Sequence, residues 1–191
     1  MNERLNGYNF FSSLFFNLPD REFVENLFSQ DLSSDAPGVD LIRAYVESVK
    51  NKDIDTIVDE IAVDRTQLVH GLTPGRGPRP PYGSLYMKST EQEQIDNLRG
   101  LNALYRAAGF TVNALTHQPS DFIGTQMAFI ELLIKQGEAT FETQKDFFNK
   151  HLNKWGTRYA DEIIKFAKTD YWRGIGHLLK SFLEEEAEVY S

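Results

Sequence analysis

Cysteine is absent from this chain of 191 residues, and the absence excludes several kinds of site. Without thiolates there is no disulfide framework, no Cys-based zinc site, no Cys-ligated iron-sulfur cluster and no cysteine nucleophile. A chain of this length buries a core large enough to stay folded without cross-links. We therefore expect a globular protein that needs neither a metal nor any other cofactor.

Positive charge and long apolar runs are also scarce. Lys and Arg number 20 against 28 Asp and Glu, the net charge is −8, and no two basic residues are adjacent. A nucleic acid or an anionic membrane would find little to bind, whereas a basic partner suits this charge. No segment is apolar for long enough to span a membrane, and the first residues lack the apolar core of a signal peptide. We expect a cytoplasmic protein without membrane insertion.

Apolar residues recur at helical spacing along almost the whole chain, and no stretch alternates for long enough to predict a strand. The pattern predicts an all-α fold of about nine helices, in which most of the 14 Phe residues belong to the core. The acidic end, Glu184 to Glu188, is expected to be a solvated terminal turn. The predicted helices carry apolar stripes within 11–18, 23–27, 41–49, 54–69, 95–105, 122–134, 141–152, 159–166 and 172–183.

A segment rich in proline and glycine interrupts these helices. Residues 71–83 hold four of the seven prolines and four glycines, a composition that no helix tolerates. Loops of this length are usually functional or disordered. We therefore expect one helical domain with an N-terminal half 1–70, a hinge loop 71–84 and a C-terminal half 85–191. We expect a monomer, with exchange of halves into a domain-swapped dimer as the alternative.

Two features keep an enzyme or a nucleotide-binding protein open as an alternative. Gly75-Arg76-Gly77 offers flexible backbone amides to a phosphate, and His117 lies close to Asp121. The loop lacks the Lys-Ser/Thr of a P-loop, however, and two candidate ligands do not make a metal site. No hydrolase motif of the Gly-x-Ser-x-Gly or His-Glu-x-x-His type is present.

Two other features favour peptide binding. Asp121 follows Pro119-Ser120 and has two interpretations. It is either the N-terminal residue of its own helix, where a negative charge favours the helix dipole, or a carboxylate in a groove that receives an Arg or Lys. The other feature is Pro80-Pro81-Tyr82, a stiff apolar platform that presents an aromatic ring at low entropic cost. Tyr86, just beyond it, is expected in the core.

Three segments resemble a known family, the TorD/DmsD-like redox enzyme maturation chaperones, which are related to the nitrate reductase delta-subunit chaperones. The resemblance covers roughly residues 60 to 185 in order and spacing. Its first segment is Leu68-Val69-His70-Gly71, a spacer, and then Pro80-Pro81-Tyr82-Gly83-Ser84-Leu85-Tyr86. The second runs from Gln118-Pro119-Ser120-Asp121-Phe122 to Ile130, and the third is Phe148-Asn149-Lys150-His151-Leu152-Asn153-Lys154-Trp155.

The resemblance implies a cytoplasmic, non-enzymatic chaperone for a molybdopterin oxidoreductase. Such a chaperone binds the twin-arginine signal peptide of its client, the apoenzyme or both, assists cofactor insertion and delays export. Family peptide-binding positions fall on Pro81, Tyr82 and Asp121, and we add the neighbouring Phe122 and Leu72. The family motifs also include Gly83, Tyr86, Pro119, His151 and Trp155, which we expect to be structural.

This sequence departs from the family pattern at three positions. Phe122 stands where the family has His, Gln126 where it has Glu, and Tyr82 where Trp is commoner. Fewer polar contacts are therefore expected at the site, while the stacking surface is retained. A general assembly subunit that contacts a folded partner without binding its signal peptide is a further alternative.

Overall fold

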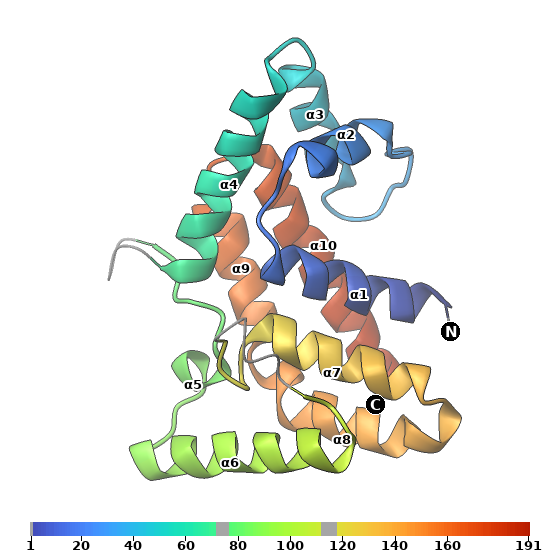
Figure 1. Cartoon of the computed structure of the whole chain (residues 1–191), viewed down its shortest axis with the longest axis vertical. Helices are drawn as coiled ribbons and strands as arrows, with labels where there is room; N and C mark the ends of the chain where they lie inside the picture. The colour runs from blue at the N-terminus through green and yellow to red at the C-terminus, as the bar shows by residue number, and fades with distance from the viewer. Residues whose placement is uncertain (1, 72–76, 112–117) are drawn as a thin grey trace. The chain divides into compact units, whose positions relative to one another are not determined.

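The computed structural model describes residues 2–71, 77–111 and 118–191. Over these ranges the chain forms ten α-helices and two short 3₁₀ turns, with no strand longer than a single bridge (Figure 1). The all-α prediction is confirmed. The helix that the sequence missed is α5 (Gly83–Tyr86), four residues long, which starts within the last residues of the predicted hinge loop. Residues 72–76 of that loop, Leu72 included, and His117 lie outside the described residues.

The chain divides into two compact units, each assembled from segments that are distant in sequence. Unit 1 comprises 1–16, 81–156 and 185–191, and unit 2 comprises 17–80 and 157–184. The chain therefore passes from one unit to the other four times, and the units do not coincide with the sequence halves on either side of the predicted hinge. The expectation of a single domain stays a prediction.

Unit 1 is built around α7 (Ile123–Lys135), an almost fully buried helix. The helix α1 (Asn2–Phe16) packs along α7, where Ser12 Oγ donates to Gly124 O at 3.2 Å and Asn9 Nδ2 donates to Glu131 Oε1 at 2.9 Å. The remaining elements of the unit are α5, α6 (Glu91–Ala107), η1 (Glu138–Thr140), α8 (Phe141–Lys150), η2 (Leu152–Lys154) and the end of α10.

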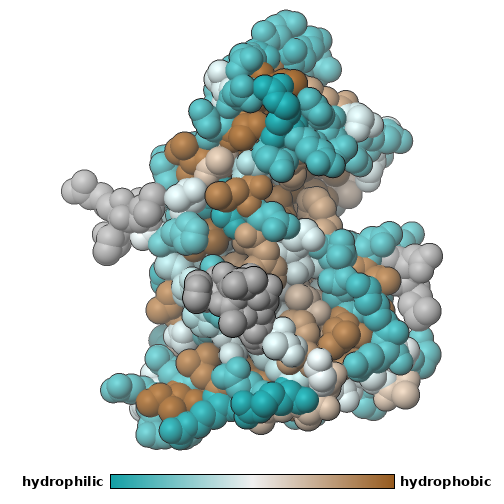
Figure 2. Space-filling model, viewed as in Figure 1, coloured by the Kyte–Doolittle hydropathy of each residue, from teal (hydrophilic) through white to brown (hydrophobic). Residues whose placement is uncertain are grey.

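The helix α6 has one buried face and one mixed face. Leu101 and Tyr105 are buried, and a capping box closes the start of the helix, where Thr90 and Glu93 satisfy each other's backbone amides. Patches of apolar surface lie among hydrophilic residues over the first part of α6 in the view of Figure 2. Ile95 and Leu104 are its exposed large apolar residues, at 38% and 42% of their full accessible area.

Unit 2 contains α2 (Arg21–Ser29), α3 (Val39–Val49), α4 (Ile54–His70), α9 (Gly156–Phe166) and most of α10 (Asp170–Val189). Its helices begin where the sequence provides caps: Asp20 accepts a hydrogen bond from Phe23 N, and Asp53 accepts from Asp55 N and Thr56 N. Gly38 adopts φ +92° before α3, and a Cβ on Gly174 of α10 would lie 2.5 Å from Gly38 O. The two backbones therefore approach too closely for any side chain.

The prediction of a solvated acidic end holds for Glu184, Glu185 and Glu188, which are exposed, but is wrong for Glu186. The helix α10 continues to Val189, and Glu186 is 2% exposed. Its carboxylate accepts both guanidinium hydrogen bonds of Arg4, at 2.6 and 2.8 Å, and a third from Tyr8 Oη at 2.7 Å. This bidentate pair fastens the first turns of α1 to the C-terminal end of the chain within unit 1. No helix of the described residues is long and apolar enough to cross a membrane.

Candidate functional site

Two of the segments that the sequence analysis singled out lie side by side in unit 1. Tyr82 and Phe122 form an isolated antiparallel β-bridge. Ile123 N donates to Pro81 O and Gly83 N donates to Asp121 O, each at 3.0 Å. The backbone of the proline-rich segment is therefore fixed to the residues that precede α7, although about forty residues separate them in sequence.

The carboxylate of Asp121 reinforces this bridge. Its Oδ2 accepts a hydrogen bond from Ser84 N at 2.8 Å, and the residue is 2% exposed. Ser84 lies in the first turn of α5, so Asp121 supplies the acceptor that the start of this short helix needs. The interpretation of Asp121 as the N-terminal residue of its own helix is wrong, because α7 begins only at Ile123 and the carboxylate serves α5.

The other carboxylate oxygen, Oδ1, accepts no hydrogen bond from the described residues. The negative charge of the Asp121 carboxylate nevertheless affects the pKa of two tyrosine hydroxyls. Burial raises the pKa of Tyr82 and of Tyr105, and the charge of Asp121 raises both further. Both hydroxyls therefore remain neutral donors: Tyr105 Oη donates to Ser120 O at 2.7 Å and Tyr82 Oη to Gln118 Oε1 at 3.2 Å.

Several aromatic side chains surround the bridge, and they differ in solvent exposure. The ring of Phe122 lies 5.8 Å from that of Tyr82 and 5.4 Å from that of Phe16, and it is fully buried. Pro81 is buried as well, whereas Tyr82 is partly exposed. Of the three bridge-segment residues Pro81, Tyr82 and Phe122, only Tyr82 is partly exposed; Phe16, behind Phe122, is partly exposed as well. Phe122 supports the ring of Tyr82 from below.

The third sequence segment also reaches this part of unit 1. The buried Trp155 stacks on Tyr86, with ring centroids 5.3 Å apart and planes 28° from parallel. A Cβ added to Gly83 would lie 3.0 Å from Trp155 Nε1, so a side chain at this position would press on the indole. His151 instead contacts Phe147 on α8, with ring centroids 5.0 Å apart. Pro119 is exposed.

Two polar residues on the first turn of α7 are buried; Thr125 was not expected at the site, and Gln126 was expected there only as a departure from the family pattern. Gln126 is fully buried, and neither of its amide atoms has a hydrogen-bond partner among the described residues; the same holds for Thr125 Oγ1. Buried polar groups without partners are rare and call for an explanation. The available signal was that Gln126 replaces the Glu of the family pattern.

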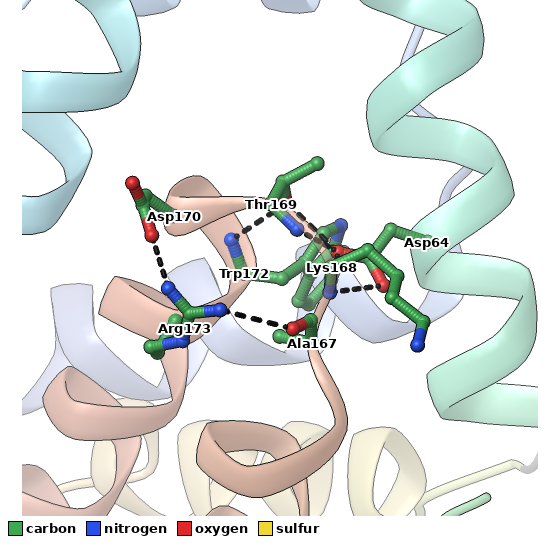
Figure 3. Close-up of polar contacts among 7 residues, drawn as sticks. All are labelled: Asp64, Ala167, Lys168, Thr169, Asp170, Trp172 and Arg173. Carbon is green, nitrogen blue, oxygen red and sulfur yellow. Dashed lines mark hydrogen bonds and ion pairs between the residues drawn. The ribbon is translucent and has the colours of Figure 1, made fainter.

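Asp64 in unit 2 was also missed, and its role is structural. Its carboxylate, 1% exposed, accepts hydrogen bonds from Lys168 N, Thr169 N and Thr169 Oγ1 at 2.8 to 3.1 Å (Figure 3). Thr169 in turn accepts from Trp172 N, so Asp64 anchors the start of α10. The sequence did contain a signal, since Asp64 occupies a helical position on the apolar stripe of Ile57, Ile61 and Leu68.

No group of three or more His, Asp or Glu side chains among the described residues is placed to hold a metal ion. A model of the nitrate reductase delta subunit family matches residues 32–161, about two thirds of the chain. The chain belongs to this family. Nitrate reductase delta subunit proteins are chaperones in the maturation of molybdenum-dependent redox enzymes. The matched range includes both segments of the β-bridge, Asp64 and Trp155.

Proposed function

We propose that this nitrate reductase delta subunit family member is a non-enzymatic cytoplasmic chaperone that binds the twin-arginine signal peptide of a molybdopterin oxidoreductase. The observation that carries the proposal is a buried carboxylate with one oxygen engaged by the protein, next to a partly exposed aromatic ring. Asp121 uses Oδ2 to hold α5, and the described residues leave Oδ1 unused. Tyr82 supplies the aromatic face.

The chemistry of the peptide suits these two groups. A twin-arginine leader has a guanidinium head followed by an apolar stretch. One guanidinium would donate to Asp121 Oδ1 in a charge-assisted hydrogen bond, which is stronger in a site of low polarity. The apolar stretch would lie against the ring of Tyr82. Phe122 and the stiff backbone of Pro81 hold that ring in orientation. Leu72 is proposed as a further apolar contact.

While the peptide is held, the export machinery has no access to it, so the client stays in the cytoplasm until its cofactor has been inserted. The net charge of −8 favours encounter with an arginine-rich peptide. Because salt screens charges beyond about 8 Å at physiological ionic strength, this attraction raises the association rate more than the affinity.

Calorimetric titration with a synthetic twin-arginine leader peptide tests the proposal. Asp121→Asn keeps a side-chain oxygen that can accept from Ser84 N but removes the charge, so we expect affinity to fall about tenfold while stability changes by about 1 kcal/mol or less. Asp96→Asn, on the exposed side of α6, is the matched control and leaves affinity unchanged. Tyr82→Ala should weaken binding and Tyr82→Phe should not.

The same titration separates the alternatives. A leader in which both arginines are replaced by glutamine should bind as weakly to the wild type as the twin-arginine leader binds to Asp121→Asn. If neither Asp121→Asn nor Tyr82→Ala changes the affinity, the site is elsewhere. If the leader does not bind at all while the whole client subunit co-purifies, the chain is a general assembly subunit.

A further inference from the structure

A second partly exposed aromatic ring lies next to the candidate site. Phe16 is the last residue of α1, and its ring centroid lies 5.4 Å from that of Phe122. Tyr82 contacts the same Phe122 ring from the proline-rich segment, at 5.8 Å. Phe122 is fully buried, whereas Phe16 and Tyr82 are both partly exposed. The site therefore has two accessible aromatic rings that share one buried ring as their support.

Gly124 makes room for this arrangement on the first turn of α7. A Cβ added to Gly124 would lie 2.7 Å from Phe122 Cε1 and 3.2 Å from Phe16 Cε2. Both rings therefore occupy the space that a side chain would fill, and they pack directly on the helix backbone. Ser12 Oγ, one turn before Phe16 on α1, donates to Gly124 O at 3.2 Å. The packing of α1 on α7 thus fixes where the Phe16 ring lies.

Further polar contacts hold α1 in register within unit 1. Asn9 Nδ2 donates to Glu131 Oε1 on α7 at 2.9 Å, and both guanidinium hydrogen bonds of Arg4 go to Glu186 on α10. The Phe16 ring is therefore held in place before any ligand arrives. A ring that is already fixed loses little conformational entropy when a partner covers it, so the burial of its apolar area contributes more fully to affinity.

We propose that Phe16 is a specificity-determining residue of the leader site, where it contacts the apolar stretch of the leader together with Tyr82. The contact selects leaders with large apolar side chains in that stretch, because small side chains would leave the two rings partly in water. The inference rests on the proposed function. Phe16 lies outside residues 32–161, which match the family model, so the contact comes from a part of the chain that this model does not cover.

Calorimetric titration with two leader peptides tests the contact. One leader carries leucines in its apolar stretch, and the other carries alanines there with both arginines kept. Phe16→Ala should weaken the leucine leader about tenfold and the alanine leader about twofold or less. Phe10→Ala is the matched control, because Phe10 is an exposed ring on the same helix and contacts Phe11. It should leave both affinities unchanged.

A second comparison separates direct contact from mere support of Tyr82. If Phe16 itself contacts the leader, Phe16→Ala should weaken the leucine leader by a similar factor in the Tyr82→Ala background. If Phe16 only holds Phe122 beneath Tyr82, it has no further effect in that background, and the inference is overturned. Phe16→Leu keeps an apolar side chain against Phe122 and carries the same test if Phe16→Ala does not fold. It should weaken the leucine leader about threefold.

NMR gives a direct readout of the same contact. Intermolecular NOEs are expected between the leucine methyl groups of the leader and the ring protons of Phe16, and none to those of Phe10. Equal losses for the leucine and alanine leaders in Phe16→Ala would overturn the inference. Leader binding that depends on Asp121 but not on Phe16 overturns this inference alone, whereas a leader that does not bind at all overturns the proposed function and this inference with it.

Discussion

Units 1 and 2 differ in whether their buried polar side chains are fully hydrogen-bonded. In unit 2 every buried side-chain nitrogen or oxygen of the described residues has a hydrogen-bond partner, and Asp64 alone accepts from two backbone amides and a hydroxyl. In unit 1, Thr125, Gln126 and His151 have buried polar atoms without one. A buried polar atom left unpaired costs about 1 to 3 kcal/mol, so unit 1 tolerates a cost that unit 2 avoids.

The two buried aspartates show what the difference means. Each takes part in fixing the start of a helix from a distant segment: Asp64 reaches 104 residues ahead to Lys168, and Asp121 reaches 37 residues back to Ser84. Asp64 uses both oxygens, whereas Asp121 uses one. The buried polar side chains of unit 2 thus use their hydrogen-bonding capacity, whereas unit 1 retains unused hydrogen-bonding capacity where we propose that a ligand binds.

The largest effect is expected from Asp64→Ala. It leaves the amides of Lys168 and Thr169 buried without an acceptor and frees the start of α10, so the free energy of unfolding should fall by about 4 kcal/mol. Urea unfolding measures this. Asp59→Ala, exposed on the same helix, should change it by about 0.5 kcal/mol or less. If the two variants are equally stable, the hydrogen bonds of Asp64 do not stabilise the start of α10.

His151 should make the stability of the protein depend on pH. Burial, together with the positive charge of Lys150, lowers its pKa to about 4 in the folded state, against an ordinary value of 6.5 in the unfolded chain. The unfolded state therefore takes up the proton first. Stability should be unaffected above pH 6.5 and fall by up to about 3 kcal/mol as the pH drops toward 4. Urea unfolding as a function of pH should show a shallower fall in His151→Gln than in the wild type.

Gly174→Ala tests the packing of unit 2. The added Cβ would lie 2.5 Å from the backbone oxygen of Gly38, which cannot rotate away as a side chain can, so we expect a loss of about 2 kcal/mol. Gly100→Ala, in the middle of α6 with nothing within 4 Å of the added atom, should instead stabilise the protein by about 0.5 to 1 kcal/mol. Thermal unfolding of both variants gives the comparison. A Gly174→Ala variant as stable as wild type would show that α10 can shift.

A small gain in stability, rather than a loss, is expected from Gln126→Met. The substitution keeps the volume and removes an unpaired amide, so stability should rise by about 1 kcal/mol. Gln144→Met is the control within unit 1. Gln144 is hydrogen-bonded to Thr140 and Tyr190, and its replacement should destabilise the protein. If Gln126 takes part in ligand binding, its replacement should also lower the affinity for the leader peptide. Unchanged affinity would show that Gln126 has no role in binding.

Much of the fold was predictable because a helix with one buried face requires apolar residues at a regular spacing along the sequence. The apolar stripes located nine of the ten α-helices. The helix α5 was not predictable. Four residues make too short a helix to be stable alone, and its first turn is held by Asp121.

The candidate site was predictable in its residues but not in its connections. Tyr82 and Asp121 were singled out by residue type and by resemblance. The structure brings their segments together, since Tyr82 forms a bridge with Phe122 and Gly83 N donates to Asp121 O. Gln126 was noted only as a departure from the family pattern. Its burial without a partner depends on what surrounds the first turn of α7, which no local pattern encodes.

The sequence by itself determined that this protein is helical and which segments carry its family motifs, because helical periodicity and short motifs are properties of neighbouring residues. Only the tertiary structure decided what the charged residues do. Glu186 was expected in solvent and is buried against Arg4, Asp64 fixes α10, and Asp121 serves α5 rather than its own helix. A buried carboxylate is stabilised by donors that come from distant parts of the chain, and those donors are near it only when the chain has folded.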